Sequence, residues 1–218
     1  CAAIIAQWGV GWAWIVAVCI FATSGAILTT LRGVGTREGR SDKSVNSEFI
    51  EGLNYVRNNP VVILILLSTL VNGLLGRSFI ELLPAVSGLL LMGGASELAW
   101  LTAAAGTGAV LGGLLMSRQA AHVMGLYRLI LVALLGATLL LATLNWLDAL
   151  ISLAVVVGLI TFTTTIAGTG CQALTQLLID PNYHGRVMSL WSMTMMASPA
   201  LGAATNGALA EWAGFVTT

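Results

Sequence analysis

The fold is decided by the run ALISLAVVVGLITFTTTIAGTGCQALTQLL, residues 149–178. This run contains no charged residue, and Asp148 and Asp180 stand at its two ends. A helix needs about 20 mostly apolar residues to cross a bilayer, so the run is long enough to span a membrane. Similar apolar runs occupy residues 12–31, 60–83, 97–117, 126–146 and 187–210. The sequence therefore predicts an all-α fold, a polytopic membrane helical bundle.

Cationic residues fall in every second gap between these runs. They are Arg32, Arg37, Arg40, Lys43 and Arg57 in one gap, Arg118 and Arg128 around another, and Arg186 in a third. The gaps at 87–94 and 145–148 contain no lysine or arginine. Cytoplasmic loops of membrane proteins carry an excess of these residues. The pattern predicts 32–59, 118–127 and 179–186 on the cytosolic side, and 84–96, 145–149 and 211–215 outside.

The composition excludes several classes of protein. Hydrophobic residues make up 57% of the chain and charged residues only 8%, whereas soluble domains carry about 25% charged residues. The net charge of zero argues against a nucleic-acid partner. His122 and His184 stand alone and the three cysteines form no close pair, so we expect no metal and no cofactor. The lipid bilayer is the expected partner.

The polar segment 32–59 has two parts. Its first part is rich in glycine and reads as a flexible linker. In its second part Val45, Phe49, Leu53 and Val56 recur at helical spacing, which predicts a short amphipathic helix. Such a helix can lie on the cytosolic membrane surface, or it can be an ordinary solvated connector.

Arg77 and Glu81 are the only ionisable pair within an apolar run. Ionisable residues inside the bilayer are costly and are functional candidates by default. Their spacing of four residues allows them to pair on one helix face, so we expect a gating or coupling element. A structural pair that snorkels to the outer interface is the alternative.

A polar stripe follows the run 149–178. Its members are spaced by three or four residues and are Thr161, Thr165, Thr169, Gln172 and Gln176. Because amides that face lipid leave hydrogen-bonding groups unsatisfied, the stripe should face protein or water. It can line a substrate path, or it can hold helices together through hydrogen bonds. Asn72 is a further substrate-path candidate, although an α-helical wheel separates it from Arg77 by about 140°.

Four strings together resemble the major facilitator superfamily, and most closely its bacterial multidrug and siderophore exporters, such as macrolide efflux and enterobactin export proteins. They are Glu51-Gly-Leu-Asn-Tyr-Val-Arg57, Gly76-Arg-Ser-Phe-Ile-Glu-Leu-Leu-Pro84, Gly185-Arg-Val-Met-Ser-Leu190, and Pro199-Ala-Leu-Gly202 followed by Gly207-Ala-Leu-Ala-Glu-Trp212. The resemblance implies a fragment that runs from the end of the fifth helix through the eleventh. Residues 1–31 would end the N-terminal half, 32–59 would be the cytosolic connector, and 60–218 would form the C-terminal half without its last helix.

The resemblance also implies which residues act. The polar stripe and the run 60–83 would line the central cavity, and Arg118 and Arg186 would belong to the cytosolic gate. One position departs from the family's pattern, because Ser117 stands where a loop motif usually has an acidic residue. This copy of the motif cannot form the usual charge network.

Three classes of function follow. The first is a proton-coupled exporter of small amphipathic molecules that works together with the N-terminal half of the same chain, in the inner membrane of a bacterium. The second is a membrane enzyme, which lacks support because both histidines are expected in cytosolic loops and not within the membrane. The third is a multi-pass sensor or scaffold that does not transport.

Overall fold

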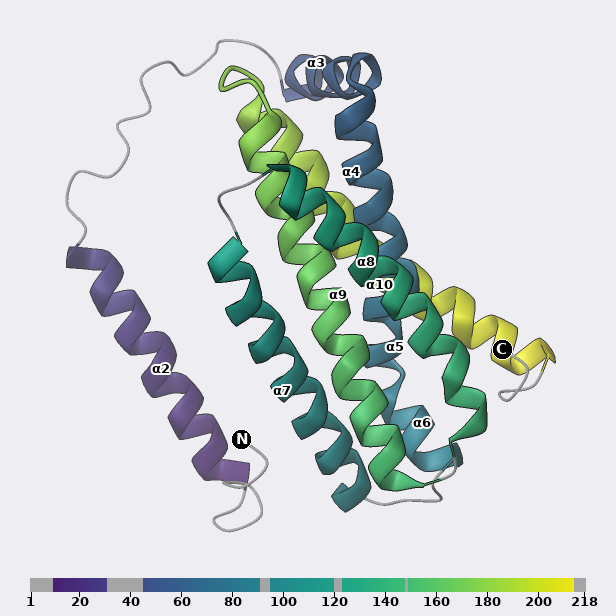
Figure 1. Ribbon diagram of the computed structural model, residues 1–218. Helices are drawn as coiled ribbons and strands as arrows, with labels where there is room; N and C mark the ends of the chain where they lie inside the picture. The colour runs from purple at the N-terminus through teal and green to yellow at the C-terminus, as the bar shows by residue number, and fades with distance from the viewer. Residues whose placement is uncertain (1–9, 31–44, 91–94, 120–122, 148, 214–218) are drawn as a thin grey trace. The chain divides into compact units, whose positions relative to one another are not determined.

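The computed structural model describes residues 10–30, 45–90, 95–119, 123–147 and 149–213 (Figure 1). Contacts divide the chain into two units, Cys1–Lys43 and Ser44–Thr218. In the first unit, α2 spans Val10–Thr30 and confirms the helix expected at 12–31. Its Thr23 and Ser24 hydroxyls donate to the carbonyl oxygens of Cys19 and Ile20. These bonds satisfy the hydroxyls within the helix, as an apolar surrounding requires.

The second unit is helical throughout its described residues. Its elements are α3 (Val45–Asn58), α4 (Pro60–Val71), the π-helix η1 (Asn72–Arg77), α5 (Ser78–Glu81), α6 (Leu83–Leu90), α7 (Ala95–Gln119), α8 (Val123–Thr143), the 3-10 helix η2 (Leu144–Trp146), α9 (Leu150–Leu178) and α10 (His184–Ala213). No strand occurs among the residues that the structure describes. The amphipathic helix expected in the second part of 32–59 is therefore present, as α3. The positive residues from Arg32 to Lys43 lie outside the described residues.

Four segments are long and apolar enough to cross a membrane. They are Pro60–Glu81, Ser96–Arg118, Val123–Thr143 and Leu150–Leu178. They confirm four of the six predicted spans. The other two, 12–31 and 187–210, are helical, but their described residues do not meet the same length and hydropathy requirement.

Helix continues beyond the end of the predicted run 60–83. The chain turns only at Leu82 and resumes as α6 at Leu83. Pro84 did not prevent this, because a proline is tolerated in the first turn of a helix, where its missing N–H is not needed.

α9 lies at the centre of the second unit, between α4, α7 and α8. Gly108 and Gly112 of α7 pack directly on its backbone. A Cβ atom on Gly108 would lie 2.9 Å from the carbonyl carbon of Gly158, and one on Gly112 would lie 2.8 Å from the carbonyl oxygen of Phe162. Close approach through small residues four apart is the usual helix contact in lipid. The spacing of the two glycines in the sequence predicts such a contact, and the structure confirms it.

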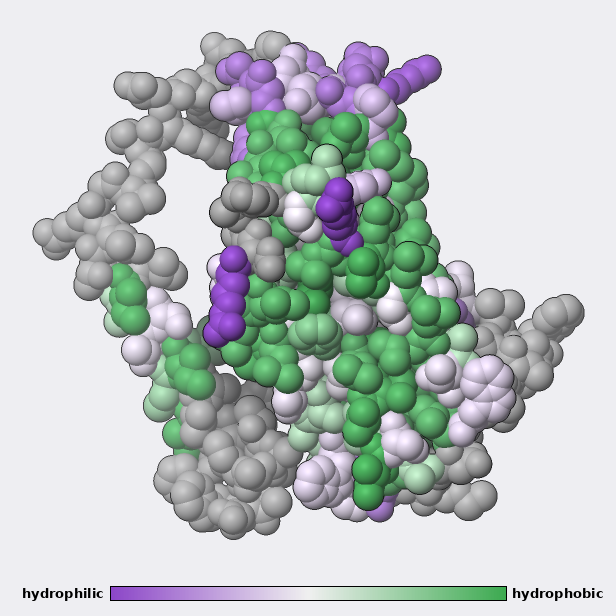
Figure 2. Space-filling model, viewed as in Figure 1, coloured by the Kyte–Doolittle hydropathy of each residue, from purple (hydrophilic) through white to green (hydrophobic). Residues whose placement is uncertain are grey.

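Polar and apolar residues are separated along the second unit. Figure 2 shows hydrophilic residues gathered at the end that carries α3, next to a broad hydrophobic band. The turn between α9 and α10 lies at the same end, whereas α6 lies at the other (Figure 1). This placement agrees with a bundle whose helices cross a membrane in alternating directions.

Candidate functional site

The polar stripe of α9 changes from buried to exposed along its length. Thr161 is 5% exposed, Thr165 and Gln172 are half-buried, and Thr169 and Gln176 are exposed. The exposed members lie in the half of α9 nearest to α3. The exposed members of the stripe therefore all lie on the half of α9 at the α3 end.

The hydroxyls of the stripe are satisfied by their own helix. Thr161 donates to the carbonyl oxygen of Val157 at 2.8 Å, and Thr169 donates to that of Thr165 at 2.6 Å. Within the described residues the amides of Gln172 and Gln176 form no hydrogen bond. These amides are consequently available to water or to a bound molecule.

A buried cluster of apolar side chains packs on the opposite end of α9. Leu83 and Val86 of α6 pack with residues of α7 and of the start of α9 in one buried cluster, which also includes Leu101, Ala105, Leu153 and Val157. Leu101, Leu153 and Val157 are fully buried. The buried end of the stripe, at Thr161, lies directly beyond this cluster. A second buried apolar cluster, which includes Ile166, Cys171 and Leu174, packs on the half of α9 nearest to α3. The two halves of α9 therefore differ in the exposure of the polar stripe and not in apolar packing.

A π-helix interrupts the first span at Asn72–Arg77. Its hydrogen bonds run from residue i to i+5, and such segments occur often at functional sites. Asn72 is 2% exposed, and its Nδ2 donates to the carbonyl oxygen of Thr164 in α9 at 3.2 Å. Its Oδ1 has no hydrogen-bond partner. A buried unsatisfied oxygen is uncommon in native structures and calls for an explanation such as a bound water or ligand.

Glycines bring η1 against both α9 and α10. A Cβ atom on Gly76 would clash with the side chain of Thr164 in α9, and one on Gly73 would lie 2.6 Å from the Cβ of Ser198 in α10. Ser198 is fully buried, and its Oγ also lacks a partner. η1 is therefore the point at which α4, α9 and α10 meet, and unsatisfied polar atoms accompany it.

An apolar groove of about 420 Å³ separates α4 from α10. It is lined by Val56, Ile63, Leu66, Leu67, Leu70, Met193, Thr194, Ala197, Ser198 and Leu201. The lining carries no charge, so the groove suits an apolar group.

Arg77 and Glu81 lie at the ends of η1 and α5, and both are exposed. No ion pair joins them within the described part of the chain. Asn72 and Arg77 face different surroundings, as expected, although the 140° separation assumed an uninterrupted α-helix and does not apply across η1.

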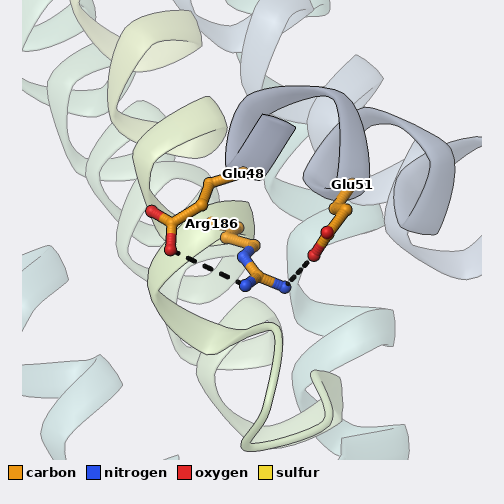
Figure 3. Close-up of polar contacts among 3 residues, drawn as sticks. All are labelled: Glu48, Glu51 and Arg186. Carbon is orange, nitrogen blue, oxygen red and sulfur yellow. Dashed lines mark ion pairs between the residues drawn. The ribbon is translucent and has the colours of Figure 1, made fainter. Parts of the chain in front are cut away.

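Arg186 at the start of α10 is held by α3 (Figure 3). Its Nη1 lies 2.7 Å from Oε2 of Glu51, and its Nη2 lies 3.8 Å from Oε1 of Glu48. Its guanidinium carbon lies 5.7 Å from the centre of the Tyr183 ring. The Tyr183 ring in turn stacks on Tyr55 of α3 at 4.5 Å.

Further contacts complete the joint between α3 and the α9–α10 turn. The backbone N–H of Asp180 donates to the Tyr55 hydroxyl at 3.2 Å. Val56 packs in a buried cluster with Val62, Ile179 and Val187. Arg118, the other expected gate residue, is exposed near the end of α7. The structure thus joins Arg186 to the connector helix, and it shows no contact between Arg186 and Arg118.

Two parts of this arrangement were not expected from the sequence. The π-helix and the buried Ser198 were missed, although the pair of glycines at 73 and 76 was a usable signal for close helix approach. The contact of Glu48 and Glu51 with Arg186 was also missed, because nothing in the local sequence links them.

The sequence matches the family model of the Major Facilitator Superfamily over residues 1–203. No curated protein and no solved structure gives a significant match. The matched region covers nearly the whole chain and includes every spanning helix described above. This multi-pass membrane protein therefore belongs to the major facilitator superfamily, whose members are transporters.

Proposed function

We propose that the protein is a secondary active exporter of small amphipathic molecules, that it is driven by the proton gradient, and that it works by alternating access in the inner membrane of a bacterium. The graded exposure of the α9 stripe is the observation that carries this proposal. Exposed polar side chains on one half of a spanning helix are what a carrier with a water path open at one end requires.

The chemistry of the path supports the substrate class. Thr169, Gln172 and Gln176 offer hydrogen bonds without charge, and the α4–α10 groove adds apolar surface. A molecule with an apolar body and a few polar groups fits both. A charged substrate would need a countercharge, which neither the stripe nor the groove supplies.

Arg77 and Glu81 are the proposed gating or coupling residues. Both are exposed, and no ion pair joins them within the described residues. Their chemistry allows them to pair with each other or to bind protons and substrate in another state. Arg118 and Arg186 lie toward the α3 end, where the proposed cytosolic gate closes.

Cysteine accessibility with substrate protection tests the proposal. Single cysteines at Thr165, Thr169, Gln172 and Gln176 should react with a water-soluble thiol reagent, and a transported dye should slow the reaction. Val155 and Leu159 are the matched controls, because they are 57% and 45% exposed on the same helix but lie away from the stripe. They should react poorly, as lipid-facing positions do.

Two outcomes would contradict the proposal. Equal reactivity at the stripe and at the controls would mean that no separate water path exists. Reaction at the stripe without any protection by dyes, in cells that also show no dye efflux, would favour a sensor or scaffold that does not transport.

A further inference from the structure

α3 has two distinct faces, and among the described residues only one of them packs on other helices. One face carries Glu48, Glu51, Gly52, Tyr55 and Val56 and packs on α4, α10 and the α9–α10 turn. The other face is exposed and carries Phe49, Ile50, Leu53 and Arg57, with Asn54 and Asn58 along one edge. Three large apolar side chains, 44%, 56% and 51% exposed, thus lie together on a single short helix.

The exposed face has an ordered charge pattern. Phe49, Leu53 and Arg57 are four residues apart and lie along one line of the helix. The acidic residues Glu48 and Glu51 lie on the packed face, where Arg186 binds both of them. The exposed face therefore presents apolar groups together with a single cation, which complements an anionic surface.

The position of α3 along the chain places this face at the edge of the bilayer. α3 ends at Asn58, and the spanning segment begins two residues later at Pro60. α3 also lies across the direction of α4 (Figure 1). A helix that lies crosswise at the start of a span has its apolar side at the depth of the lipid headgroups.

The apolar face of α3 is continuous with that of the bundle. Val56, on the packed face, lies about 60° around the helix from Leu53. It lines the α3 end of the α4–α10 groove together with Ile63 and Leu66. Beyond these residues the surface of α4 continues with Val61 and Leu64, which are 52% and 54% exposed. The side chains of Phe49 and Leu53 therefore extend an apolar surface that already belongs to the membrane-spanning part.

We propose that this face of α3 docks on the leaflet at the positively charged end of the bundle, which the positive-inside rule makes the cytosolic leaflet. Phe49, Ile50 and Leu53 lie at the boundary between headgroups and acyl chains. The Arg57 guanidinium reaches a lipid phosphate, as long cationic side chains do at this depth. The ligand is an anionic phospholipid surface, and through Arg186 the docked α3 fixes the start of α10 relative to it.

Fluorescence quenching in vesicles tests the docking. The whole protein, with its three native cysteines replaced, carries one bimane-labelled cysteine at Phe49, at Leu53 or at Asn54. Asn54 is the matched control, because it is exposed on the polar side of the same helix. A lipid-borne spin label should quench positions 49 and 53 several-fold more than 54, and aqueous iodide should show the reverse order.

Two results would overturn the docking. If iodide reached Leu53 as well as it reaches Asn54, α3 would be a solvated connector. If neither quencher reached Phe49 or Leu53, protein rather than lipid would cover the face. Since both positions are labelled independently, failure of one variant to reconstitute leaves the other as a complete test.

The lipid charge is tested separately. Replacing pure phosphatidylcholine by an equal mixture with phosphatidylglycerol should increase lipid quenching at Leu53. Arg57→Gln should abolish this increase, whereas Arg128→Gln, an exposed cation on α8, should leave it unchanged. An increase that survives Arg57→Gln would contradict the assigned role of Arg57.

Discussion

Gly108 and Gly106 lie two residues apart on α7 and should respond in opposite ways to alanine. A Cβ atom on Gly108 would lie 2.9 Å from the carbonyl carbon of Gly158, and closer still to its oxygen. Both atoms belong to the α9 backbone, so no side-chain rotation can relieve the contact. At Gly106 no atom lies within 4 Å of the added methyl group.

The magnitude follows from two opposing terms. Ordinary contact begins at 3.4 Å, so in Gly108→Ala α7 and α9 must separate by at least half an ångström along their main interface. Overpacking of this kind costs about 1–3 kcal/mol. Replacing a helical glycine by alanine returns up to about 1 kcal/mol. We therefore expect Gly106→Ala to be neutral or to stabilise by up to about 1 kcal/mol, and Gly108→Ala to be less stable than Gly106→Ala by about 1–3 kcal/mol.

The assay is thermal or SDS-induced unfolding of the purified protein in detergent, monitored by tryptophan fluorescence. Gly112→Ala and Gly113→Ala provide a second matched pair. A Cβ atom on Gly112 would lie 2.8 Å from the carbonyl oxygen of Phe162, and one on Gly113 would have no atom within 4 Å. Equal stability of Gly108→Ala and Gly106→Ala would refute the reasoning, because it would mean that the two helices do not approach each other at Gly108.

Three further predictions concern the candidate site. A cysteine at Gln176 should react with a soluble thiol reagent much faster than one at Thr161, because only Thr161 is buried in this state; the reverse order would place the opening at the α6 end. Arg186→Lys keeps the charge but loses the planar guanidinium group that reaches both Glu51 and Glu48, so we expect the free energy of unfolding to fall by about 0.5–1 kcal/mol. An unchanged free energy of unfolding would mean that these ion pairs do not stabilise the protein. Asn72→Ala should reduce dye efflux severely while costing only about 0.6 kcal/mol of stability; an unchanged efflux rate would leave Asn72 with a packing role.

Local patterns in the sequence predicted most of the fold. The apolar runs gave the spanning helices, and the spacing of Phe49, Leu53 and Val56 gave α3, because these periodicities report directly on burial. The small-residue contact of Gly108 and Gly112 was predictable for the same reason. The end of the span that begins at Pro60 was not predictable, because the residues after Pro84 are apolar and could form either a helix or a loop.

The candidate site was predictable only in part. The stripe on α9 could be read from spacing within one helix, but its graded exposure depends on where α6 and α7 pack. The contact of Arg186 with Glu51 joins residues far apart in the sequence. The π-helix left no periodic signature, because its apolar residues differ little from those of the α-helix on either side.

The π-helix at Asn72–Arg77 also has a consequence for insertions and deletions. A turn closed by i to i+5 bonds contains one residue more than an α-helical turn. Deleting one residue here, for example the exposed Leu75, would restore a continuous α-helix without shortening any other element. Elsewhere in a spanning helix, such a deletion turns every later side chain by about 100° and exchanges its buried and lipid-facing sides. η1 is thus a place where a membrane span can absorb a change in length, and related sequences that lack one residue at this point should keep α4 in the same register.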